Sequence, residues 1–108
     1  MEITSINKEL LDSSERLKNA SNELFKLARE KAEAERDYRR ALHHAIMELK
    51  IAGERATLIP DLARGQVAEI KFTRDLSDAR FTAGREALDA IKTQVSSLQT
   101  ILKYQTEV

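Results

Sequence analysis

The chain has 108 residues, and its 18 lysines and arginines balance its 18 aspartates and glutamates, so overall charge does not favour nucleic acid, an anionic membrane or an acidic substrate as the partner. Charged residues make up 33% of the chain and aromatic residues 5%, a composition typical of long helices and coiled coils. The absence of cysteine excludes disulfides, thiolate metal ligands and cysteine nucleophiles. No stretch approaches the roughly 18 apolar residues of a membrane span, and the first residues lack the pattern of a secretory leader. We therefore expect a cytoplasmic protein that does not enter a membrane.

The first half of the chain predicts one long helix over about residues 5–52. Apolar and small residues recur there at alternating steps of three and four, as on one face of a coiled-coil helix; they are Ile3, Ile6, Leu10, Leu17, Ala20, Leu24, Leu27, Ala34, Tyr38 and Ala41. Ser13 and Lys31 occupy positions of the same spacing and interrupt the apolar row. After Tyr38 the better register shifts by one residue to Leu42, Ala45, Leu49 and Ala52.

Residues 53–59 predict a turn. Gly53 follows the last apolar position and suits the left-handed residue that commonly ends a helix. Thr57 is the expected N-cap of the next helix, in which Pro60 lies in the first turn and Asp61 near the positive end of the helix dipole. At Gly65 two alternatives remain: the helix that starts near residue 60 continues through it, at a cost of roughly 1 kcal/mol relative to alanine, or Pro60–Arg64 is a short helix of its own. We favour the continuous helix.

The second half predicts a helix over about residues 60–104. Its clearest row is Leu88, Ile91, Val95, Leu98 and Leu102, and a second apolar strip runs through Phe72, Leu76, Ala79, Ala83 and Ala87. Val67, Ile70 and Phe81 widen this face further. A wide apolar face is expected to have more than one neighbour.

Two long helices joined by a short turn must run antiparallel, so the sequence predicts an all-α fold: one domain, residues 1–108, formed by a long coiled-coil-like two-helix hairpin. A lone hairpin buries only one stripe on each helix and is marginally stable at this size. Four apolar residues lie off the main rows and are candidates for self-association: Phe25, Ile46, Phe72 and Phe81. We expect them to form a homodimer with a four-helix arrangement, or to dock another protein.

Sites of catalytic chemistry are not supported. His43 and His44 are adjacent and point about 100° apart on a helix, and neither the Glu-x-x-His nor the His-Glu-x-x-His pattern is present, so a metal site is not expected. No glycine-rich phosphate loop and no nucleophile with a nearby base is found. The sequence predicts neither an enzyme nor a bound cofactor.

A local excess of basic residues lies toward the turn end of the hairpin. Residues 36–74 contain eight basic residues against five acidic ones. Interleaved acids and few aromatic residues for base stacking weaken a nucleic-acid hypothesis, and a solvated face of ion pairs is the alternative. The candidate contacts to a partner or to nucleic acid are Arg36, Arg39, Arg40, His43, Arg64, Lys71 and Arg74.

Three segments of the second half carry a resemblance: ATLIPDLARG at residues 56–65, RDLSDARF at residues 74–81 and SSLQTILKYQ at residues 96–105. This half of the chain resembles short helical proteins, mostly uncharacterised, of bacteriophages and prophages of Gram-positive bacteria. The resemblance implies a small accessory product in the cytoplasm of the host cell, and it transfers no catalytic or binding residue.

Three functions follow as hypotheses. The first is a non-enzymatic protein that docks on a host or phage machine, with inhibition of a host defence effector such as a CRISPR nuclease as one concrete version. The second is an accessory factor in phage recombination or replication that binds DNA or a DNA-bound protein through the basic turn end. The third is a structural helper in assembly.

Overall fold

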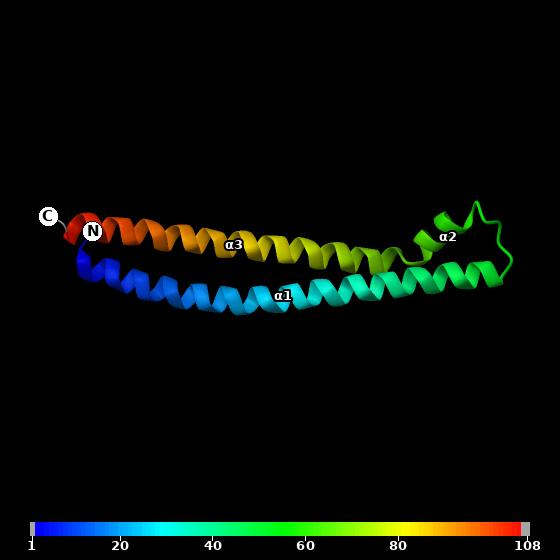
Figure 1. Ribbon diagram of the computed structural model, residues 1–108, viewed down its shortest axis with the longest axis horizontal. Helices are drawn as coiled ribbons and strands as arrows, with labels where there is room; N and C mark the ends of the chain where they lie inside the picture. Colours follow the sequence, from blue (N-terminus) through cyan, green and yellow to red (C-terminus); the bar gives the residue numbers. More distant parts are fainter. Residues whose placement is uncertain (1, 107–108) are drawn as a thin grey trace. The chain divides into compact units, whose positions relative to one another are not determined.

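The computed structural model describes residues 2–106, which form three helices and no strand (Figure 1). The helices are α1 (Ile3–Ile51), α2 (Ile59–Gln66) and α3 (Ala68–Thr106). α1 and α3 pack against each other in opposite directions, because α1 residues of rising number contact α3 residues of falling number, as in the pairs Lys31–Asp78 and Glu35–Arg74. The predicted all-α antiparallel hairpin is confirmed. None of the helices within residues 2–106 is long and apolar enough to cross a membrane.

The end of α1 is closed by a Schellman motif. Gly53 has a φ of 80°, the only positive φ among the described residues. Its N–H donates to the Lys50 carbonyl at 3.1 Å, and the N–H of Glu54 donates to the Leu49 carbonyl, also at 3.1 Å. These bonds satisfy carbonyl groups that the end of a helix leaves without partners. The predicted role of Gly53 is confirmed.

The second helix differs from its prediction at two points. It is interrupted, because α2 ends at Gln66 and α3 begins at Ala68, whereas Gly65 lies inside α2. The interruption is a kink at Val67, where the backbone leaves helical geometry with φ −105° and ψ 13°. Main-chain bonds bridge the kink from Val67 to Ala63 and from Lys71 to Val67. Thr57 is not the N-cap either, since Leu58 holds that position and no side chain caps the helix.

The chain divides into two compact units, each with its own core. The first unit comprises residues 2–26, which include the start of α1, and residues 82–106 of α3. Ile6, Leu88 and Leu98 are its buried apolar side chains, and Ser13 is also buried, at 2% exposure. The apolar rows predicted on both helices supply the half-buried remainder: Leu10, Leu17, Ala20, Leu24, Ile91, Val95 and Leu102.

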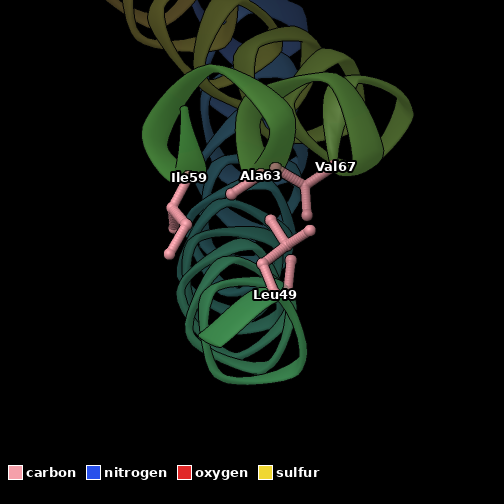
Figure 2. Packing of buried hydrophobic residues seen from close by; sticks show 5 residues of the cluster. Leu49, Ile59, Ala63 and Val67 are labelled. Atoms are coloured by element: carbon pink, nitrogen blue, oxygen red, sulfur yellow. The ribbon is translucent and has the colours of Figure 1, made fainter. Parts of the chain in front are cut away.

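The second unit, Leu27–Phe81, contains the rest of α1, all of α2 and the start of α3. Its core forms where α2 lies on the last turns of α1, and Figure 2 shows Leu49 directed toward Ile59, Ala63 and Val67. Ala63 is completely buried. Its side chain is a single methyl group, so the backbones of α1 and α2 can approach closely there. Around this cluster pack Tyr38, Ala41, Leu42 and Ile46. After Tyr38, α1 therefore packs against α2. The one-residue shift of the apolar row in the sequence begins where this contact begins. Ala52, by contrast, is exposed.

Candidate interaction surface

The second apolar strip of α3 is not part of the core. In the second unit the half-buried residues of α3 are Arg74, Ser77 and Phe81, and Arg74 and Phe81 contact side chains of α1. Leu76 lies two residues from Arg74, about 160° away around a helix of 3.6 residues per turn. Phe72, Leu76 and Ala79, which we call the outer strip, therefore point away from α1. Phe72 is 64% exposed and Leu76 49%.

The outer strip is the feature of this unit that most resembles a docking surface. Its residues are spaced four and three apart, the spacing with which one helix packs against another. A phenylalanine and a leucine that are left in water by intramolecular packing provide apolar anchors of the kind that interfaces bury. The outer strip is the candidate interaction surface.

The four residues predicted for self-association differ in unit and in surroundings. Ile46 packs against the core at the turn end, and Phe81 is half-buried between the helices. Phe25 is 73% exposed and belongs to the first unit, on α1. Of the four, only Phe72 lies on the outer strip.

Most of the basic residues predicted to contact a partner are paired with carboxylates. Arg36 bonds Asp37, Arg39 bonds Glu35, Arg64 bonds Asp61, Lys71 bonds Asp75, and Arg74 bonds both Asp75 and Glu35. Arg40 and His43 are exposed and make no such pair within residues 2–106. The arrangement matches the solvated face of ion pairs that the sequence offered as the alternative to a nucleic-acid site.

Lys71, Arg74 and Asp75 form the tightest of these ion-pair clusters. Lys71 Nζ lies 2.7 Å from an Asp75 oxygen, and Arg74 Nη2 lies 3.0 Å from the other. Two hydrogen bonds lower the pKa of Asp75 below its ordinary value: the larger effect comes from Lys71 and the smaller one from Arg74. The hydrogen bond to Asp75 raises the pKa of Arg74 in turn. Both cations are therefore held by an ionised carboxylate at neutral pH.

A shallow groove of about 490 Å³ runs between α1 and α3 in the second unit. Two alanines and six charged side chains line it: Ala28, Ala32, Lys31, Glu35, Arg39, Arg74, Asp75 and Asp78. Every charged group in the lining pairs with another member of the lining, for instance Lys31 with Asp78 at 3.1 Å. The polar groups are thus already satisfied within the protein, and the groove offers a ligand no unpaired charge.

The adjacent histidines do not converge on a common site. Nε2 of His44 lies 3.1 Å from a Glu48 oxygen on the next turn, and both side chains are mostly exposed. Among the residues that the structure describes, no group of three or more histidine or carboxylate side chains could hold a metal ion.

The inward face of α3 was only partly predicted. The row Leu88, Ile91, Val95, Leu98 can be extended backwards at the same three-and-four spacing to Gly84, Phe81, Ser77 and Arg74, which are all half-buried. Three of these four positions hold polar or small residues, so the row that begins at Phe72 is the more apolar of the two. Spacing, rather than hydrophobicity, was the signal that could have identified the inward face.

Comparisons with known proteins add no relative. The chain matches no protein-family model, no curated protein and no solved structure.

Proposed function

We propose that the protein is a non-enzymatic docking protein that binds a macromolecular partner through the outer strip of α3. The observation that carries the proposal is the exposure of Phe72 and Leu76 on the face of α3 opposite α1. A fully buried phenylalanine or leucine contributes about 1.5–3 kcal/mol relative to an exposed one. A partner that covers both would therefore gain a substantial part of its binding free energy from two side chains.

The resemblance to phage and prophage proteins gives the proposal its setting. In that setting the partner is a component of a host or phage machine, and a host defence effector such as a CRISPR nuclease is one concrete version. Homodimerisation into four helices, an accessory role in DNA recombination or replication, and a role in assembly are the competing hypotheses.

The DNA hypothesis has less support from the side chains. Phosphate binding needs lysines and arginines that can exchange counterions for the nucleic acid. Five of the seven predicted contacts are instead held by carboxylates of the same chain. Charge reversal at Arg36, Arg39 and Arg40 tests the hypothesis, because it should abolish DNA-dependent binding and spare docking through the outer strip.

Site-specific photo-crosslinking tests the docking proposal. The photoreactive residue p-benzoylphenylalanine replaces Phe72 in one protein and Phe25 in a control, a phenylalanine of similar exposure on α1 of the other unit. Both proteins are irradiated in lysate of phage-infected host cells, with and without nuclease. We expect one protein partner to crosslink from position 72 but not from position 25, and to do so after nuclease treatment.

A second arm measures affinity for the captured partner once it is purified. Phe72→Ser should weaken binding at least about tenfold, which corresponds to 1.4 kcal/mol, whereas Phe25→Ser should leave it unchanged. Equal crosslinking from both positions, or loss of every crosslink after nuclease treatment, would contradict the proposal.

A further inference from the structure

The two long helices of the second unit carry the same short pattern. In each, a cation is followed four residues later by a carboxylate and seven residues later by an aromatic residue. The pattern is Lys31, Glu35 and Tyr38 on α1, and Arg74, Asp78 and Phe81 on α3. Lys31 and Arg74 both occupy positions in the rows that face the other helix, where a coiled coil normally places apolar residues.

The antiparallel pairing matches the cation of each pattern with the acid and the aromatic ring of the other. Lys31 Nζ lies 3.1 Å from an Asp78 oxygen and 4.8 Å from the centre of the Phe81 ring. In the reverse direction, Arg74 Nε lies 3.6 Å from a Glu35 oxygen and its Cζ lies 4.1 Å from the centre of the Tyr38 ring. The two sets of contacts are therefore reciprocal.

These contacts are too exposed to be a main source of stability. The side chains of Lys31 and Asp78 are 44% and 59% exposed, and ion pairs of that exposure contribute little. These contacts instead distinguish one alignment of α3 along α1 from another. A polar residue at a core position of a coiled coil fixes alignment at a cost in stability.

The partners of Lys31 and Arg74 change when α3 is shifted along α1 by one heptad. If α3 slides seven residues in one direction, Lys31 faces Lys71 and Arg74 instead of Asp78 and Phe81, which brings cations together. If it slides seven residues in the other direction, Lys31 faces Arg85, and Arg74 faces Leu42 and Ala45. Both shifts keep many apolar contacts, because the rows repeat every seven residues, yet both leave the two cations without their carboxylates.

We infer that the repeated cation–acid–aromatic pattern is a register lock, which selects one alignment of α3 on α1 against alignments shifted by a heptad.

The test measures alignment directly. The chain contains no cysteine, so Arg40→Cys and Ala79→Cys introduce two unique sites for spin labels, one on each helix of the second unit. A slide of one heptad moves α3 by about 10 Å along α1 at 1.5 Å per residue. Pulsed electron paramagnetic resonance, which measures the distance between the two labels, resolves such a change. The parent protein should give one narrow distance distribution.

The decisive variant replaces both cations by leucine, Lys31→Leu with Arg74→Leu. It should remain helical and melt at an equal or higher temperature, because charged groups at core positions give way to apolar ones. Its distance distribution should nevertheless broaden or split as shifted alignments become populated. The matched control Arg29→Leu with Arg36→Leu removes two cations that pair with carboxylates of α1 itself and should keep the narrow distribution.

A charge reversal provides a second arm if the leucine variant aggregates. Lys31→Glu places an acid opposite Asp78 in the native alignment, whereas shifted alignments offer it Lys71 or Arg85. We expect part of the population to adopt an alignment displaced by about 10 Å along α1, which adds a second distance to the distribution. A single narrow distribution at the parent distance, in either folded variant, would overturn the inference.

Discussion

Replacing glycine by alanine should destabilise the protein at Gly53 and stabilise it at Gly65. A Cβ added at Gly53 or at Gly65 meets no atom within 4 Å, so neither substitution creates a clash. The two positions differ in backbone conformation: Gly53 has a φ of 80°, and Gly65 lies within α2. Any difference in stability between the two variants must therefore arise from the backbone.

The magnitudes follow from that difference. A left-handed conformation costs an ordinary L-residue about 1–2 kcal/mol, and alanine recovers about 0.4–1 kcal/mol by restricting the unfolded chain. Gly53→Ala should thus destabilise the protein by about 1 kcal/mol. Gly65→Ala should stabilise it by up to about 1 kcal/mol, the difference in helix propensity between the two residues.

Urea unfolding followed by circular dichroism at 222 nm measures both free energies. The two variants should differ by about 2 kcal/mol, with the parent protein between them. Asparagine tolerates the left-handed region better than alanine, so Gly53→Asn should recover part of the loss. Equal effects of alanine at both positions, or a stable Gly53→Ala variant, would refute the assignment of Gly53 as the left-handed residue that ends α1.

Two further predictions concern the second unit. The pKa of Asp75 is lower in the folded chain than its ordinary value, so its contribution to stability is present above the ordinary carboxyl range and is lost as pH falls through the folded-state pKa. A carboxyl NMR titration should show this low pKa, and Lys71→Met should raise it; an unchanged titration in that variant would contradict the hydrogen bond as its main cause. In the core at the turn end, Leu49→Ala should cost about 2–3 kcal/mol in urea unfolding. Ile51→Ala, two residues further on at a side chain that is 83% exposed, should change stability by less than about 0.5 kcal/mol, and similar losses for the two would show that α2 does not cover α1 as described.

The sequence by itself determined that the chain forms long helices in an antiparallel hairpin, although it did not show the break between α2 and α3. Heptad spacing persists on α1 even across Ser13 and Lys31, because the period reports which positions face a neighbour whatever residue occupies them. Gly53 was assigned correctly for a local reason, since only the end of a helix calls for a left-handed residue at that point.

Only the tertiary structure decided which of the two rows of α3 faces α1. Around residues 72–81 the more apolar row points outward. The other row faces α1, because Phe81 contacts Lys31 and Arg74 contacts Tyr38 in cation–aromatic pairs. A pattern search that ranks rows by hydrophobicity cannot anticipate contacts between a charged residue on one helix and an aromatic residue on the other. The kink at Val67 is tertiary in origin as well: it turns α2 so that Ile59 and Ala63 cover Leu49, and this burial compensates for a break in the helix that the local sequence does not require.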